Sequence, residues 1–143
     1  MFNPTREQAR QFLFESWQKF RDGVPMTGLE TMAVDVMGLH PEYHQMLDQP
    51  DKYMDKDYSP EAGDTNPFLH LMMHLSIREQ ISIDQPMGVK SYYQRLTLRL
   101  GGVHDAEHAL IDCLGEMIWH AQRYRTQPDP SIYLTCLEGK LQA

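Results

Sequence analysis

The chain has 143 residues, which is the size of one compact domain. Hydrophobic residues make up 41% of it and charged residues 23%, an ordinary globular composition that excludes collagen-like, low-complexity and wholly disordered chains. Acidic residues outnumber basic ones by 20 to 13, and the net charge of -7 argues against a protein built to bind nucleic acid or an anionic membrane.

The first third of the chain has helical periodicity. Apolar residues recur at i, i+3 and i+4 spacing between Asn3-Pro4 and Asp22-Gly23, which predicts a first helix. Thr27 and Glu30 have the spacing of a capping box at the start of a second helix. Pro41 breaks or restarts that helix, since proline cannot donate a hydrogen bond to the preceding turn, and we expect a short helical turn after it.

Residues 49–65 are polar and rich in turn-forming residues. They predict a loop over the surface that contains at most one short turn of helix.

Four further helices are predicted in the rest of the chain. Asn66-Pro67 is a typical helix start, and the helix that runs from there to about Ser82 is apolar on most of its circumference. The next ends at Gly101-Gly102, another covers about 103–125, and the last begins after Asp129-Pro130. No stretch alternates as a strand would. We therefore predict an all-α fold, a single-domain bundle of five or six helices over residues 1–143 with a polar loop at about 49–65.

The first residues, the most apolar stretch and the cysteines indicate in which cellular compartment the protein is expected. The first residues show no basic segment followed by an apolar one, so we expect no secretory signal. The most apolar stretch, Phe68–Leu75, is far shorter than the roughly 20 residues that a membrane span needs. Cys113 and Cys136 are the two cysteines and have no CxxC spacing. They predict two small buried apolar side chains, with no disulfide framework and no thiolate zinc site, in a cytoplasmic protein.

Histidines carry the main chemical signal. The chain has 7 of them, and six form pairs at i, i+4 spacing: His40/His44, His70/His74 and His104/His108. Residues four apart on a helix project from one face, so two imidazoles can meet one cation. Helical bundles build metal sites from such inward-facing pairs, and neutral imidazole suits zinc, iron, copper or nickel.

The three pairs are not equivalent. His40 precedes Pro41, which disfavours the helical conformation, so we do not expect His40 and His44 to share one helical face. The best candidate ligands for one transition metal ion (zinc, iron or nickel) are His70, His74, His104 and His108. Nearby carboxylates that could assist them are Asp105, Glu107 and Asp112. The alternative is that these histidines are buried and hydrogen-bonded to tyrosines or carboxylates.

Several stretches together resemble a known family. They are MFNP at 1–4, HPEYH at 40–44, NPFLHL at 66–71, MH at 73–74, EQISIDQP at 79–86, CLGEMIW at 113–119 and AQR at 121–123. In these the chain resembles a bacterial protein family catalogued only as a domain of unknown function. The resemblance covers nearly the whole chain, implies no activity, and transfers no functional residue.

Two functions are compatible with the sequence. The first is a small helical protein without catalytic activity, which acts by association with itself as a homodimer or with another protein. The second is a metal-binding helical bundle with the histidine site described above, in which a catalytic role stays open. No zinc-protease HExxH, nucleophile-elbow GxSxG or phosphate-loop motif is present, and we expect neither nucleic acid nor membrane as a partner.

Overall fold

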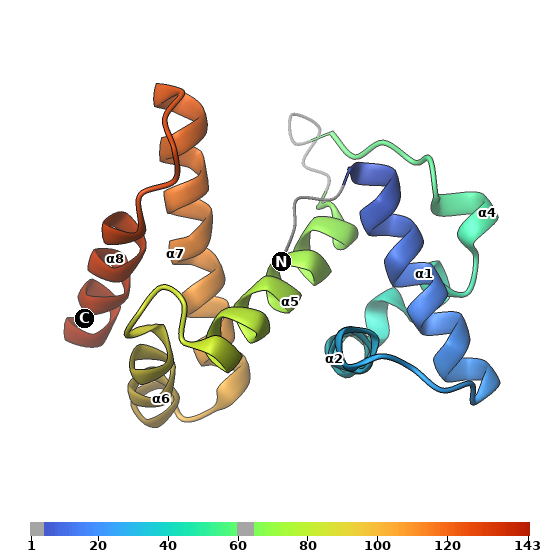
Figure 1. Cartoon of the computed structure of the whole chain (residues 1–143), viewed down its shortest axis with the longest axis horizontal. Helices are drawn as coiled ribbons and strands as arrows, with labels where there is room; N and C mark the ends of the chain where they lie inside the picture. Colours follow the sequence, from blue (N-terminus) through green and yellow to red (C-terminus); the bar gives the residue numbers. More distant parts are fainter. Residues whose placement is uncertain (1–4, 60–64) are drawn as a thin grey trace. The chain divides into compact units, whose positions relative to one another are not determined.

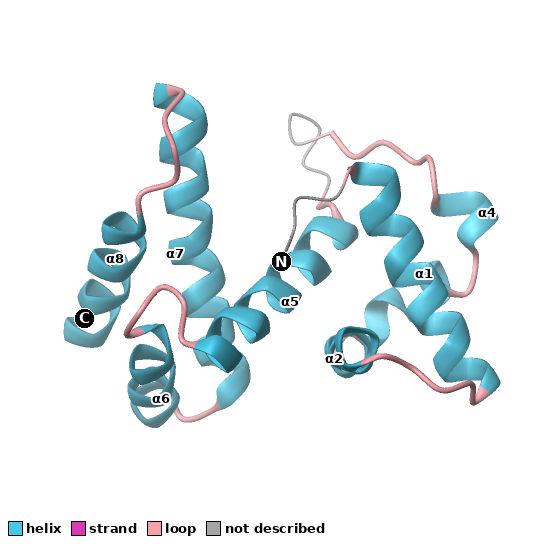
Figure 2. Cartoon of the chain, viewed as in Figure 1, coloured by secondary structure: helices cyan, strands magenta, loops and turns pink. Residues whose placement is uncertain are grey.

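The structure is a computed structural model that describes residues 5–59 and 65–143. Within these ranges all regular elements are helical (Figure 2), which confirms the all-α prediction. The elements, in chain order, are α1 (Arg6–Asp22), α2 (Gly28–Gly38), the 3-10 helix η1 (Pro41–Tyr43), α3 (His44–Leu47), α4 (Pro50–Tyr53), α5 (Pro67–Ile83), α6 (Val89–Leu100), α7 (Val103–Tyr124) and α8 (Pro130–Gln142).

The predicted number of five or six helices is too low, because the described part of the chain has eight α-helices. The two that raise the number above six, α3 and α4, are one turn long, and both lie where the sequence predicts a short helical turn and not a full helix. α4 starts with Pro50 and is the short turn expected inside the polar loop at 49–65. Residues 60–64 of that loop lie outside the described residues.

Both long helices of the first third begin in capping boxes. The Thr5 hydroxyl accepts a hydrogen bond from the Gln8 backbone amide, and Thr27 accepts one from Glu30, at 3.1 and 3.2 Å. These hydroxyls satisfy backbone amides that have no partner inside the helix. α1 ends at Gly23 in the left-handed conformation, with φ 68°, which glycine adopts without a steric penalty.

The chain divides into two compact units, residues 1–75 and 76–143, and the division falls within α5. The first unit packs α1, α2, α3 and the first half of α5 around one apolar core. Its members are Leu13, Phe14, Trp17, Ala33, Val34, Val36, Met37, Met46, Leu47, Phe68, Leu71 and Leu75. The prediction of one domain over 1–143 stays a prediction.

The second unit holds α6, α7, α8 and the end of α5. α7 and α8 run side by side in opposite directions (Figure 1), and the buried Tyr133 of α8 donates a hydrogen bond from its hydroxyl to Gln80 of α5 at 2.8 Å. None of the described helices is both long and apolar enough to cross a membrane.

A disulfide joins Cys113 of α7 to Cys136 of α8, with a Cα–Cα distance of 5.5 Å. The prediction of two separate buried thiols is therefore wrong. Only the antiparallel packing of α7 on α8 brings together these positions, which lie 23 residues apart, and cysteine spacing alone carries no trace of it.

Candidate metal centre

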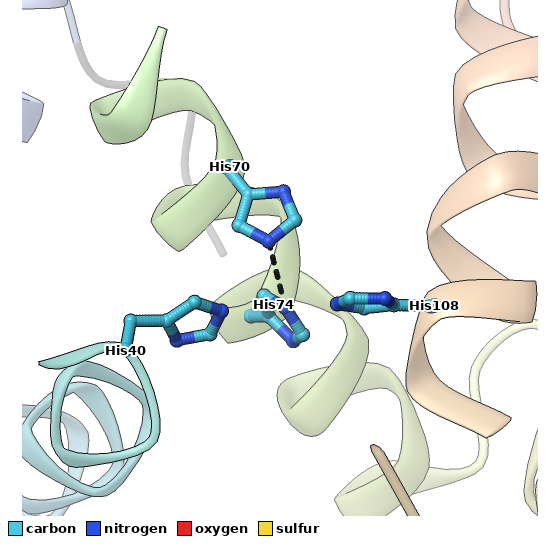
Figure 3. A group of neighbouring side chains, drawn as sticks. All are labelled: His40, His70, His74 and His108. Atoms are coloured by element: carbon cyan, nitrogen blue, oxygen red, sulfur yellow. Dashed lines mark hydrogen bonds between the residues drawn. The ribbon is translucent and has the colours of Figure 1, made fainter. Parts of the chain in front are cut away.

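His70 and His74 face each other across one turn of α5. The helix begins where the Asn66 side chain accepts hydrogen bonds from the backbone amides of Phe68 and Leu69, at 3.0 and 3.2 Å. Because residues four apart share a helix face, the two rings meet, and their Nε2 atoms are 3.2 Å apart (Figure 3). His74 is 1% exposed, so this contact lies in the interior.

His40 approaches the same two rings from the end of α2. Its backbone has left the helical conformation, with φ -125° and ψ 67°, as the following proline requires. The chain turn brings the ring centroid of His40 to 4.7 Å from that of His74 and 5.1 Å from that of His70. The His40 ring is buried, with 4% of the residue exposed.

A backbone carbonyl fixes the tautomer of His40. Its Nδ1 lies 2.8 Å from the carbonyl oxygen of Val36, and since a carbonyl can only accept, Nδ1 carries the proton and donates it. Nε2 therefore keeps its lone pair in the ring plane. Metal-binding histidines commonly have one nitrogen held in this way while the other coordinates the ion.

The spacing of the three histidines suits a metal ion. Each offers a ring nitrogen, and these nitrogens lie within 4.8 Å of one another. Nitrogens about 2.0 Å from a tetrahedral zinc ion lie roughly 3.3 Å apart. The Nε2 atoms of His70 and His74 are already at that separation, and His40 offers a ring nitrogen within 4.8 Å of the nitrogens that they offer.

The aromatic ring of Tyr43 lies against this cluster. It stacks on the His40 ring with centroids 5.5 Å apart and an interplanar angle of 2°. Burial, and secondarily the charge of Glu42, raises the pKa of the Tyr43 phenol, so the phenol is neutral at pH 7. It adds apolar ring surface next to the imidazoles without adding a charge.

The predicted ligands divide between two places. His70 and His74 lie together in the first unit. His104 and His108 lie on the first two turns of α7, in the second unit, with ring centroids 4.3 Å apart; His104 is exposed and His108 half-buried. Their assignment to the same ion as His70 and His74 stays a prediction.

His40 is the residue that sequence reasoning missed. The sequence shows the i, i+4 pair that it forms with His44, and the non-helical backbone of His40 agrees with the prediction that Pro41 prevents a shared helical face. That prediction does not distinguish His40, whose ring lies beside those of His70 and His74, from His44. His44 turns away, with its Nε2 donating to the Met37 carbonyl at 2.8 Å and its ring on Trp17, while the break before Pro41 directs His40 toward α5.

Two of the three candidate carboxylates have cationic partners. Glu107, 2% exposed, accepts two hydrogen bonds from the guanidinium of Arg78, at 2.9 and 3.3 Å. Asp112 is exposed and lies 3.4 Å from the ammonium of Lys140. Asp105 lies in the first turn of α7, where its negative charge interacts favourably with the positive end of the helix dipole.

Comparison with known proteins identifies a family and no function. The family model described as "Domain of unknown function (DUF1841)" matches residues 5–139, nearly the whole chain. No curated protein matches the chain, and no solved structure matches it.

Proposed function

Since the chain belongs to the DUF1841 family, whose description states no function, we propose its function from the site itself: the protein binds one transition metal ion through His40, His70 and His74. The observation that carries the proposal is the 3.2 Å separation of the His70 and His74 Nε2 atoms beside a third buried imidazole, His40.

A histidine hydrogen-bond network is the competing interpretation. A direct bond between two Nε2 atoms needs one ring to donate and the other to accept, so it engages a single lone pair. A metal ion engages the lone pairs of both rings and that of His40 as well. The binding free energy of an ion coordinated by all three imidazoles would stabilise the folded state.

The donor set selects the class of ion. Three neutral nitrogens suit zinc, iron, nickel or copper and do not suit magnesium or calcium, which prefer oxygen ligands. Three histidines also leave a tetrahedral ion one further position, as catalytic zinc sites do. The same three ligands therefore support either a structural ion with a fourth protein ligand or a reactive ion with a bound water.

His104 and His108 of α7 stay the further ligands predicted from the sequence. Of the two, the half-buried ring of His108 suits a ligand better than the exposed ring of His104.

Elemental analysis of untagged protein tests the proposal. We expect close to one equivalent of zinc, iron or nickel per chain after dialysis against a slight excess of the ion. The His74→Ala variant should lose the bound metal, and His108→Ala should bind it with lower affinity. The control His120→Gln, which changes a histidine elsewhere on α7, should keep both the bound metal and the affinity of the wild type. Protein that stays metal-free, with a melting temperature unchanged by any of the three ions, would refute the proposal, because a ligand of the native state must raise stability.

Association with a second copy or with another protein stays a prediction from the sequence, as do a cytoplasmic location and the exclusion of nucleic acid partners. The second unit exposes large apolar side chains, among them Leu98 at 85% and Met87 at 79%. Single exposed apolar residues are normal on a monomer, so they do not favour association over metal binding.

A further inference from the structure

The disulfide between α7 and α8 has two unequal ends. Cys113 is completely buried on α7, whereas Cys136 on α8 is half-buried. Thiol–disulfide exchange requires a thiolate to reach one of the two sulfurs, so access decides which sulfur is attacked. The surroundings of Cys136 therefore determine whether this bond can open in the folded protein.

The residue three positions after Cys136 has no side chain. Side chains on a helix lean toward its N-terminus, so a side chain at position 139 would cover the turn that carries Cys136. Position 139 is a glycine, and a Cβ atom built on it would meet nothing within 4 Å. The turn that carries Cys136 is thus left uncovered on this side.

The charges nearby suit an attacking or departing thiolate. Lys140 follows Cys136 by one turn and lies 3.4 Å from Asp112, the neighbour of Cys113 in the chain. A lysine ammonium close to a cysteine favours its thiolate form, and the paired carboxylate moderates that effect.

We propose that Cys113–Cys136 is a thiol-exchange site at which a small-molecule thiol attacks Cys136. The incoming thiolate forms a bond to the Cys136 sulfur, and the Cys113–Cys136 bond breaks. The electron pair leaves on the Cys113 sulfur, which takes up a proton. A second thiolate then attacks the thiol-derived sulfur of the mixed disulfide and releases Cys136. The protein disulfide gains two electrons and two thiols are oxidised to their disulfide.

We expect the second unit to stay folded when the disulfide opens. α8 stays attached through contacts that do not involve sulfur, namely the Tyr133–Gln80 hydrogen bond, the buried side chain of Leu137 and the Lys140–Asp112 ion pair. Because these keep α8 on α7, the two thiols stay close and the bond can form again. Opening of the disulfide is therefore a reversible modification of the native protein, and it is independent of metal binding.

Single-cysteine variants of the full chain, exposed to oxidised glutathione as the probe, test the direction of attack. Cys113→Ser, which keeps Cys136, should gain one glutathione by intact mass, at least tenfold faster than Cys136→Ser, which keeps Cys113. Equal rates in two variants with native circular dichroism spectra would overturn the proposal.

Reduction of the intact disulfide tests the access route without removing either cysteine. Reduced glutathione should open the bond in the folded wild-type protein. Alkylation of the released thiols and measurement of the intact mass follow this reaction. Gly139→Leu should slow this several-fold, while Gly28→Leu, a substitution of another open glycine on α2, should leave the rate unchanged. Opening that occurs only on global unfolding, or at the same rate in Gly139→Leu, would contradict the inference.

Discussion

The Nε2 atoms of His70 and His74 lie 3.2 Å apart, which is both a hydrogen-bond length and the separation of two ligands on one small cation. In the hydrogen-bonded form one ring carries its proton on Nε2. In the metal-bound form both Nε2 atoms are deprotonated, so that ring moves its proton to Nδ1. Metal binding as proposed therefore requires a change of tautomer in one of the two rings.

Metal affinity should fall on the acid side of neutrality. Each ligand must be neutral to coordinate, so protons compete with the ion for the ring nitrogens, and the affinity should decrease as the pH falls. Zinc competition titrations between pH 8 and 5.5 measure it. A flat profile would indicate that the ion is held by other groups.

His40 and His44 should have opposite roles although they are one helical turn apart in sequence. His40→Ala removes a proposed ligand and should abolish tight metal binding. His44→Ala should keep one equivalent of metal and lower stability, because it removes the ring that packs on Trp17 and a hydrogen bond to the Met37 carbonyl. The expected loss is about 1–2 kcal/mol. Metal analysis and urea unfolding of both variants separate the two effects, and loss of metal from both would show that local packing, not coordination, was disturbed.

The long helices could be predicted because local signals mark them. Thr27 with Glu30, and Asn66 with Pro67, are helix-start patterns whose hydrogen bonds form within a few residues, so no tertiary knowledge is needed. Pro41 and Pro50 likewise mark the short helical turns that become α3 and α4. The Cys113–Cys136 bond depends on packing between segments distant in the chain, and no local pattern encodes it.

Only part of the proposed site could be predicted from the sequence, for the same reason. His70 and His74 meet because one helix carries both. His40 joins them only through the turn that follows α2, and its backbone is not helical where a helix-based argument looks for helix. The proline rule correctly predicts that residue 40 is not helical, but where its side chain points depends on the rest of the fold.

Reduction or removal of the disulfide should destabilise the protein without unfolding it. The bond closes a loop of about two dozen residues, for which chain entropy gives roughly 3 kcal/mol. Cys113→Ala/Cys136→Ala should therefore unfold at lower urea concentration with an unchanged circular dichroism spectrum. A double variant as stable as the wild type would mean that the bond adds nothing to the folded state.

The acid stability of the α2 start should depend on Glu30. A hydrogen bond from Lys19, then one from the Thr27 backbone, lowers the pKa of the Glu30 carboxyl. A lowered pKa in the folded state stabilises the protein above the ordinary glutamate value and loses that effect as the pH falls through the folded value. Glu30→Gln should thus be less stable than the wild type at pH 7, with a gap that narrows below about pH 4.5. Urea unfolding at several pH values measures the gap, and Lys19→Met should reduce it.

Removing one partner of the Arg78–Glu107 ion pair should lower the free energy of unfolding strongly, whereas replacing both partners with apolar residues should lower it little. The Glu107 side chain is 3% exposed and that of Arg78 is 25% exposed, so Arg78→Met leaves a carboxylate buried without its cation. Breaking a buried pair in this way costs about 3–5 kcal/mol, and the partial exposure of Arg78 points to the lower end of that range. Arg78→Met combined with Glu107→Leu removes both charges and should recover most of the loss. A double-mutant cycle by urea unfolding measures the coupling, and additive losses would show that the two charges do not stabilise each other.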